Sequence, residues 1–281
     1  MKLAAVVVLY NPPVGYIQNI RSYADHVTLL IVVDNTEIPG DPEYNALKEF
    51  NHLQIITNNE NKGIAAAIND GIEFAVKEGY EWVLTMDQDS GFTSGMISRY
   101  LEFFGAMPGK ELVAVVGPVH DKSVNPANEV YEVTGLITSG SFINTTIFKT
   151  VGGYNEKLFI DEVDLEYCYR SKLGGFKILE FSHIGMEHTL GKIKNVRTPR
   201  GREKAKNLHS PLRLYYIVRN CCYVIKKYKK HFPMEMKNKR KDLLVRIKNN
   251  LLYGNHRFES VRKMIRGYAD YRRNRFGKYN G

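Results

Sequence analysis

The N-terminal part of the chain alternates short apolar runs with segments of helical pattern, and this alternation constrains the fold most strongly. Residues 4–9, 27–33, 53–56 and 82–86 form apolar runs rich in β-branched residues. Segments 16–23 and 64–75 carry apolar residues at helical spacing. Strands that alternate with helices predict a mostly parallel sheet in a doubly wound α/β domain with flanking helices.

Polar residues follow three of these predicted strands. They are Tyr10-Asn11, Asp34-Asn35 and Asp87-Gln88-Asp89. Open α/β sheets bind ligands at the carboxyl ends of their strands. We therefore expect these residues to gather at one edge of the sheet and to form a binding site.

Asp87 and Asp89 place two carboxylates, one residue apart, directly after a buried strand. Two neighbouring carboxylates repel each other unless a positive charge lies between them. Their hard oxygen atoms suit a divalent cation such as Mg²⁺ or Mn²⁺, which commonly accompanies phosphates. The alternative is a solvated turn, because Asp, Ser and Gly all favour turns.

Charge divides the chain into two parts. Residues 1–190 hold 13 Lys and Arg against 25 Asp and Glu, a net charge of −12, whereas residues 191–281 hold 27 against 5, a net charge of +22. A strongly basic tail implies a polyanionic partner: nucleic acid, anionic lipid or a phosphorylated substrate. From residue 208 onward, apolar stripes at helical spacing are bordered by Lys and Arg. This pattern suits helices on a membrane surface or helices packed on the body.

The length of 281 residues allows one large domain with an appendage. We expect a catalytic domain over residues 1–207 and a basic helical region over residues 208–281. No apolar run is long enough to cross a membrane, and we interpret the N-terminal run as a strand and not a signal peptide. Cys168, Cys221 and Cys222 are odd in number and lack metal-ligand spacing, which fits a reducing cytosol.

Motifs in chain order resemble family 2 glycosyltransferases of the GT-A fold. They are Val7–Asn11, Val32–Asn35, Asn61–Asn69 and Asp87–Asp89, and two further segments, Phe159–Glu166 and His209–Asn220, resemble bacterial polysaccharide rhamnosyltransferases. The resemblance implies an inverting, metal-dependent enzyme that transfers L-rhamnose from dTDP-rhamnose to a saccharide acceptor, which can be lipid-diphosphate-linked. A UDP-hexose is the alternative donor.

The resemblance also assigns the donor site. Asp34 would accept a hydrogen bond from the imide N–H of thymine or uracil, and Tyr10 would flank the base. Gly63 would allow close backbone approach at a helix start, whose amides favour anions. The alternatives are a turn at Asp34 and an ordinary helix start at Gly63. The full set of expected donor residues is Tyr10, Asn11, Asp34, Asn61, Gly63, Asp87 and Gln88.

A metal site is implied at the same place. Asp89 is the first candidate ligand, with Asp87 reaching either the ribose or the metal, and His188 resembles the late histidine of the family. The metal would neutralise the departing diphosphate as a Lewis acid. His183 is a weaker candidate for the same role, with a structural role as the favoured alternative.

The catalytic base is expected among the carboxylates of Asp161, Glu162 and Asp164, which also suit a helix N-terminus as caps. Many family members have a Glu-Asp pair here, whereas this chain has Asp161-Glu162. We favour Asp161 as the base and keep Glu162 as the alternative. A base opposite the leaving group implies inversion by single displacement.

The acceptor side is assigned by two further motifs. Ser139 and Gly140 resemble the loop under the acceptor sugar, although a plain turn is the alternative. Arg213, Tyr216 and Arg219 share one predicted helix, where the two arginines could clamp a diphosphate or form a solvated basic face.

Two other classes of protein compete with this interpretation. A nucleotidyltransferase would need a Gly- and Arg/Lys-rich N-terminal motif, but residues 6–20 contain one Gly and no Arg or Lys. A non-catalytic nucleic-acid or membrane binder would use the basic tail but leaves the acidic domain unexplained. We therefore expect a cytoplasmic enzyme, peripheral on the inner face of the membrane, without a nucleic-acid partner. Its oligomeric state is open, with a homodimer as one alternative.

Overall fold

The computed structural model describes residues 2–38, 42–120, 129–188, 193–197 and 203–281, with only the backbone described at 187–188 and 193–197. The chain divides into two compact units. Unit 1 comprises Met1–Phe159 and Val163–Thr189, and unit 2 comprises Ile160–Glu162 and Leu190–Gly281. The two units are described separately below.

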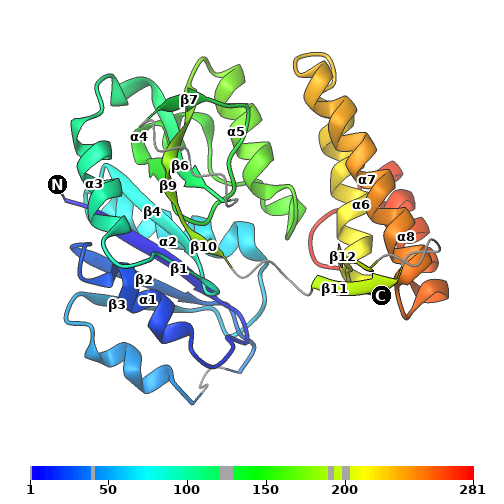
Figure 1. Cartoon of the computed structure of the whole chain (residues 1–281), viewed down its shortest axis with the longest axis horizontal. Helices are drawn as coiled ribbons and strands as arrows, with labels where there is room; N and C mark the ends of the chain where they lie inside the picture. The colour runs from blue at the N-terminus through cyan, green and yellow to red at the C-terminus, as the bar shows by residue number, and fades with distance from the viewer. Residues whose placement is uncertain (1, 39–41, 121–128, 189–192, 198–202) are drawn as a thin grey trace. The chain divides into compact units, whose positions relative to one another are not determined.

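Unit 1 is built on a sheet whose described strands follow the order β3-β2-β1-β4-β8-β6-β9-β7 (Figure 1). These strands are β1 Ala4–Leu9, β2 Leu29–Asp34, β3 Leu53–Thr57, β4 Trp82–Asp87, β6 Val113–Val119, β7 Val130–Glu132, β8 Ser141–Asn144 and β9 Lys177–Gly185. β8 and β7 run antiparallel to their neighbours, and the remaining neighbouring pairs are parallel. The sheet is therefore mostly parallel, as the sequence predicts.

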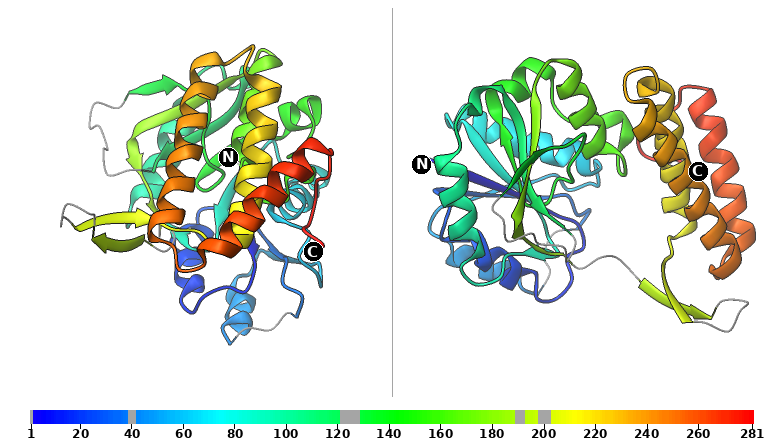
Figure 2. Two further views of the ribbon diagram at one scale, coloured as in Figure 1. Left: turned by 90° about the vertical axis from the view of Figure 1, so that its right-hand side faces the viewer. Right: turned by 45° about the horizontal axis from the view of Figure 1, so that its top comes forward.

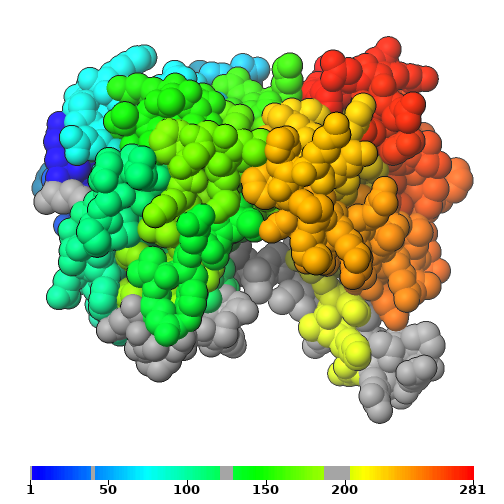
Figure 3. All heavy atoms as spheres, turned by 90° about the horizontal axis from the view of Figure 1, so that it is seen from above, coloured from blue at the N-terminus to red at the C-terminus, as the bar shows by residue number. Residues whose placement is uncertain are grey.

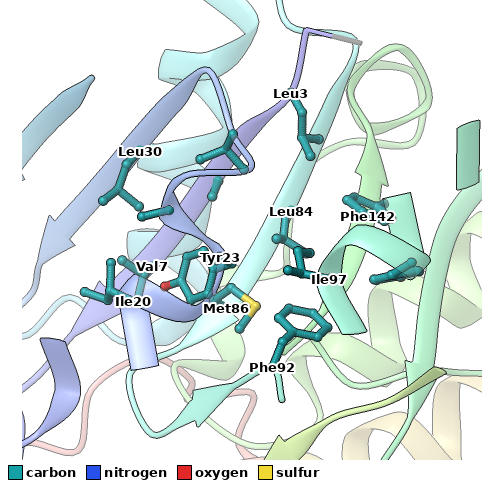
Figure 4. Packing of buried hydrophobic residues seen from close by; sticks show 14 of the residues in the cluster. Leu3, Val7, Ile20, Tyr23, Leu30, Leu84, Met86, Phe92, Ile97 and Phe142 are labelled. Atoms are coloured by element: carbon teal, nitrogen blue, oxygen red, sulfur yellow. The ribbon is translucent and has the colours of Figure 1, made fainter. Parts of the chain in front are cut away.

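Helices cover both faces of this sheet. The helices of unit 1 are α1 Tyr16–Ala24, α2 Ile64–Lys77, α3 Met96–Ala106, α4 Thr145–Val151 and α5 Val163–Leu173, with 3-10 turns η1 Tyr44–Glu49, η2 Lys110–Leu112 and η3 Glu156–Leu158. Apolar residues on alternate positions of β1, β2 and β4 meet α1 and α3 on one face. Figure 4 shows Val7, Leu84 and Met86 of the strands packed toward Tyr23 and Ile97.

On the opposite face, α2 packs closely against β1 and β2. A Cβ atom at Gly71 would lie 2.5 Å from Val6 Cγ1 and 3.1 Å from Val33 Cγ2. Only glycine permits this approach, so the helix-interior glycine has a packing role. Asn69 of the same helix accepts from Tyr154 N–H and donates to Tyr154 O, which ties α2 to the loop before η3.

One helix begins later than its sequence pattern indicates. The acidic segment from Phe159 to Asp164 was expected to open a helix, but α5 begins only at Val163. Phe159, Asp161 and Glu162 all have positive φ, at 67°, 62° and 68°. Left-handed backbone is incompatible with an α-helix, so Asp161 and Glu162 lie before α5 and not within it. The two carboxylate oxygens of Glu162 bond to Cys221 and Lys239.

The described part of unit 2 contains a β-ribbon and three long helices. They are β11 Ile193–Arg197, β12 Glu203–Asn207, α6 Pro211–Tyr228, α7 Pro233–Tyr253 and α8 Arg257–Arg272. The helices, yellow to red, lie side by side in both views of Figure 2, and Figure 3 shows their atoms as a continuous surface. Gly267 allows α8 to approach α6, because a Cβ there would lie 2.4 Å from Tyr215 O. Among the described helices, none has the length and apolar character needed to span a bilayer.

Candidate functional site

The register of the parallel strands brings three predicted site segments to one edge of the sheet. Leu9 of β1 pairs with Asp34 of β2, and Val8 pairs with Asp87 of β4. The carboxyl ends of β2, β1 and β4 therefore terminate within one residue of one another. The polar residues that follow these strands come together as the sequence analysis expected.

Gln88 fastens the end of β4 to the end of β1. Its Oε1 accepts from Tyr10 N–H at 2.8 Å, and its Nε2 donates to Tyr10 O at 3.2 Å. Asn19 of α1 donates to Gln88 O at 3.0 Å. The backbone at Tyr10 is therefore fixed, while its side chain remains 42% exposed and free to contact a planar ligand.

Asp34 is buried at the end of β2. Its Oδ1 accepts from Thr36 N–H at 3.0 Å, and Thr36 Oγ1 in turn accepts from Asn11 N–H at 3.2 Å. Asn11 adopts a left-handed conformation with φ 43°, which Asn tolerates better than most residues. These contacts hold the turns after β1 and β2 together. Asp34 therefore has the turn role given as an alternative above, and it occupies the position expected for the residue that binds the nucleotide base.

Asn35 organises the loop before α2, a role the sequence analysis did not assign. Its Oδ1 accepts from Lys62 N–H at 3.1 Å and from Asn58 Nδ2 at 3.2 Å, and its Nδ2 donates to Asn61 Oδ1 at 3.3 Å. Asn61 Oδ1 also accepts from Gly63 N–H. Asn58, Asn59 and Asn61 cluster in this loop, but only the fold shows that Asn35 binds it.

The close backbone approach expected at Gly63 is made to another part of the protein, namely Phe159. It has φ 87°, and a Cβ atom would lie 2.5 Å from Phe159 Cδ2 and 2.6 Å from Phe159 O. The first amide of α2, Ile64 N–H, donates to Phe159 O at 2.8 Å. This part of the helix start therefore binds the chain segment that leads to the predicted base.

Ser139 and Gly140 hold the end of β4 by hydrogen bonds. Ser139 is fully buried, and its Oγ accepts from Asp87 N–H at 3.1 Å. Gly140 has φ 75° and donates its N–H to Thr85 O at 2.8 Å. The described contacts give these two residues a positioning role for Asp87, so an acceptor sugar would not touch Ser139 in this conformation.

Asp87 and Asp89 remain half-buried in the turn after β4, and their carboxylates supply hard oxygen atoms. The backbone of β10, Glu187–His188, pairs with β5, Ser90–Gly91, and places His188 opposite Ser90. The side chain of His188 lies outside the described residues. Among the side chains that the structure does describe, no three His, Cys, Asp or Glu residues form a metal-binding group.

His183 is buried among aromatic side chains. Its ring lies 4.2 Å from the Phe103 ring centroid and stacks on Phe181 at 5.7 Å. Burial, followed by the charge of Arg99, lowers the pKa of His183. An aromatic environment of this kind suits a neutral, structural imidazole.

Asp161 and Glu162 belong to unit 2, where each meets a cation. Arg213 Nη2 donates to Asp161 Oδ1 at 3.1 Å, while the buried Asp161 Oδ2 has no hydrogen-bond partner among the described residues. Burial raises the pKa of the Asp161 carboxyl, and Arg213 partly opposes this shift. Lys239 Nζ lies 2.6 Å from Glu162 Oε2.

Arg219 is fully buried within unit 2 and differs in this respect from Arg213, whose side chain is 50% exposed. The Arg219 guanidinium donates to Gly277 O at 2.7 Å and lies over the rings of Tyr215 and Tyr216 at 5.2 and 5.0 Å. A phosphate cannot reach a guanidinium in this position. Of the two arginines predicted to bind a diphosphate, only Arg213 is therefore accessible. Tyr216 belongs to the same buried cluster as Arg219, and its hydroxyl accepts from Tyr279 N–H.

The sheet and its flanking helices have the GT-A fold. The chain belongs to glycosyl transferase family 2, because the model of that family matches residues 9–160. It is 28% identical over 256 residues to the dTDP-rhamnosyl transferase RfbF of Shigella flexneri, covering 82% of this chain and 81% of the relative. The family, fold and enzyme class expected from the sequence are thus confirmed.

Solved structures share this fold at low sequence identity. S. aureus TarS superimposes with a TM-score of 0.58 at 16% identity, covering 96% of this chain and 48% of that chain. TarS 1–349 in complex with UDP-GlcNAc gives 0.59 at 15%, covering 96% and 80%. GalNAc-T7 with UDP, GalNAc and Mn²⁺ gives 0.55 at 14%, covering 91% and 58%. The chain spans about half the length of full TarS, and these likenesses concern the fold alone.

Proposed function

We propose that this chain transfers L-rhamnose from dTDP-rhamnose to a saccharide acceptor, with inversion at the anomeric carbon. The observation that carries the proposal is the convergence of Asp34, Tyr10 and the Asp87–Asp89 turn at one edge of the sheet. The choice of donor is supported by the similarity to the Shigella flexneri relative, a dTDP-rhamnosyl transferase.

In this proposal the nucleotide lies along the fixed strand ends. The buried Asp34 carboxylate retains one oxygen beyond its bond to Thr36 N–H, and this oxygen accepts from the imide N–H of thymine. The exposed ring of Tyr10 flanks the base. Both groups are held by backbone contacts, which keeps them positioned before the donor binds.

A divalent metal, Mg²⁺ or Mn²⁺, is proposed at the Asp87–Asp89 turn. The two carboxylates provide the oxygen donors that such ions prefer, and the β10–β5 pairing brings the backbone of His188 next to this turn. Asp89 is the proposed direct ligand, with Asp87 and His188 beside it. When bound, the metal would neutralise charge on the diphosphate leaving group.

Asp161 is the proposed general base. Arg213 donates to its Oδ1, while its Oδ2 has no hydrogen-bond partner among the described residues. Because Oδ2 is buried in this conformation, it would accept the proton of an acceptor hydroxyl only after a local opening of the site. The raised pKa makes this carboxylate a stronger base than an exposed one. The half-exposed Arg213 is the proposed contact for an acceptor diphosphate, as in a lipid-linked saccharide of cell-surface polysaccharide synthesis.

A donor panel tests the activity. The purified chain is incubated with dTDP-rhamnose, UDP-GlcNAc or UDP-glucose and a lipid-diphosphate-linked saccharide as the acceptor, with Mn²⁺, Mg²⁺ or EDTA, and release of nucleoside diphosphate is measured. We expect turnover of dTDP-rhamnose that EDTA abolishes. Preference for a UDP-hexose would contradict the proposed donor, and turnover in EDTA would contradict the metal role of Asp89 and His188.

The base assignment has its own test. We expect Asp161→Asn to lower kcat by about 10²- to 10⁴-fold, because the amide cannot accept the acceptor proton. Binding of dTDP, measured by calorimetry, should stay unchanged. Retention of kcat by Asp161→Asn would contradict the assignment.

We further propose that unit 2 holds the enzyme on an anionic membrane surface. Exposed apolar residues of α8 recur at helical spacing, and exposed cations lie beside them; the apolar residues are Phe258, Val261, Ile265 and Tyr268, and the cations are Arg257, Arg262, Arg272 and Arg273. Phe258 is 86% and Ile265 is 65% exposed. An apolar stripe bordered by cations is typical of helices on anionic bilayers, where each basic residue contributes about 1 kcal/mol.

Vesicle co-sedimentation tests this surface. We expect binding to phosphatidylcholine vesicles that contain phosphatidylglycerol, and little binding without the anionic lipid. Phe258→Asp with Ile265→Asp should abolish it, whereas Val14→Asp, which changes an 85% exposed apolar residue of unit 1, should not. Equal binding by all variants would contradict the proposal.

A further inference from the structure

The predicted base lies in a short segment of unfavourable backbone conformation. We call Ile160–Glu162 the base segment, since it carries Asp161. Asp161 and Glu162 have φ values of 62° and 68°, in the left-handed region that non-glycine residues rarely adopt. Consecutive residues in this region persist only where surrounding contacts hold them. Such contacts come from α6 and α7, within the same unit as the segment.

Asn220 of α6 holds the backbone of the segment. Its Nδ2 donates to Ile160 O at 2.6 Å and to Asp161 O at 3.2 Å, and the Asn220 side chain is fully buried. Its Oδ1 accepts from Arg219 Nε at 2.9 Å, which fixes the orientation of the amide. Arg219 therefore acts on the segment through Asn220.

Glu162 holds the other end of the segment by its side chain. Its Oε2 pairs with Lys239 Nζ of α7 at 2.6 Å, and the two side chains are only 12% and 10% exposed. Its Oε1 accepts from the Cys221 thiol at 3.1 Å. Both carboxylate oxygens are thus engaged, and the charge is neutralised by a buried ammonium. This differs from Asp161, whose Oδ2 has no partner among the described residues.

We infer that Asn220 and Lys239 are positioning residues that hold the base segment so that Asp161 is presented for catalysis, with Glu162 as the anchor and not the base. The inference rests on the proposed function only in naming Asp161 as the base. The anchoring itself follows from contacts within unit 2. It predicts that residues of the basic tail control the rate of the chemical step.

The test compares Lys239→Met, Lys239→Arg and Lys237→Met in the full chain. Lys237 is an exposed lysine of the same helix and serves as the matched control. We expect Lys239→Met to lower kcat by about 10- to 100-fold, because small displacements of a catalytic group have effects of this size. The KM for the donor should change little, since the segment does not belong to the nucleotide site. Lys239→Arg should restore most of the rate, and Lys237→Met should behave as wild type.

The variant Glu162→Gln tests whether Glu162 anchors the base segment or is itself the catalytic base. We expect Glu162→Gln to lose no more activity than Lys239→Met. The double variant Glu162→Gln/Lys239→Met should lose no more activity than either single variant, because the two residues act as one pair. A loss in Glu162→Gln as large as that of Asp161→Asn would overturn the inference. So would wild-type kcat in Lys239→Met.

Hydrogen–deuterium exchange of the peptide that contains residues 159–164 provides a readout without substrate. We expect faster exchange in Lys239→Met and Asn220→Ala than in wild type and Lys237→Met, with the overall helical content unchanged by circular dichroism. Unchanged exchange in both variants would overturn the anchoring role. If the wild type turned over no nucleotide sugar, the proposed function would fail, but this exchange measurement would still decide the anchoring.

Discussion

Gln88 continues the pairing of β1 and β4 beyond the last paired backbone residues by bonding both backbone polar groups of Tyr10 with its side-chain amide. A side chain thus replaces the main chain where β4 turns away toward Asp89. The contact joins the residue proposed to flank the base to the turn proposed to hold the metal. Two parts of the proposed donor site are therefore joined by this side chain.

Replacement of Gln88 should weaken donor binding. We expect Gln88→Ala to raise the KM for the donor by about tenfold, because two hydrogen bonds of about 0.5–1.5 kcal/mol each are lost. The kcat should change less, since the base is untouched. Steady-state kinetics check this, with Gln18→Ala, an exposed glutamine of α1, as the control. An unchanged KM in Gln88→Ala would show that Tyr10 needs no such support.

Substitution of Gly63 should destabilise unit 1. A Cβ at this position meets the Phe159 ring and carbonyl within 2.6 Å, and the backbone has φ 87° and ψ 160°, which is essentially restricted to glycine. We expect Gly63→Ala to lower the free energy of unfolding by about 2–5 kcal/mol through strain and overpacking. Urea unfolding followed by the fluorescence of Trp82, the single tryptophan, measures it.

Gly79→Ala is the matched control for this change. Gly79 also has positive φ, 75°, but a Cβ there would meet nothing within 4 Å. Its cost should be limited to the conformational term of about 1–2 kcal/mol. Equal losses in the two variants would show that the contact with Phe159 contributes nothing.

The sequence predicted the sheet edge well because strand ends are local features. Apolar runs ending at Tyr10, Asp34 and Asp87 determine where strands stop, and the parallel topology then brings these ends together. Partners distant in sequence were not predictable in the same way. Nothing local indicates that Asn35 binds the loop before α2, or that Gly63 packs on Phe159.

The base region shows the same limit more sharply. A run of Asp and Glu before an apolar helix pattern is typical of helix caps, and propensity alone favours that interpretation. The long-range contacts of Asn220 and Lys239 override it and stabilise left-handed backbone. The burial of Arg219 was also unpredictable, because an arginine on an amphipathic basic helix is ordinarily exposed.

The pH dependence of catalysis should report on Asp161. Burial raises the pKa of this carboxyl. The acidic limb of the pH profile of kcat should therefore fall at a higher pH than it would for a base with the pKa of an ordinary aspartate. Arg213 lowers this pKa. Its removal in Arg213→Met should therefore raise the pKa further and shift the acidic limb to higher pH, while Arg240→Met, an exposed arginine of α7, should leave it in place. A shift to lower pH would contradict the assignment of Asp161 as the titrating base.

Acid should destabilise unit 2 through His209. Burial, with the charges of Arg213 and Arg246, lowers its pKa from 6.5 to about 4. Between these values the unfolded chain binds a proton that the folded chain does not, so stability is fully present above about pH 6.5 and is lost as the pH falls toward 4. Thermal unfolding followed by circular dichroism should show a smaller loss of Tm on acidification in His209→Gln than in wild type, whereas His256→Gln, an exposed histidine before α8, should match wild type. If His209→Gln lost as much stability as wild type over this range, the buried neutral imidazole would not be the cause.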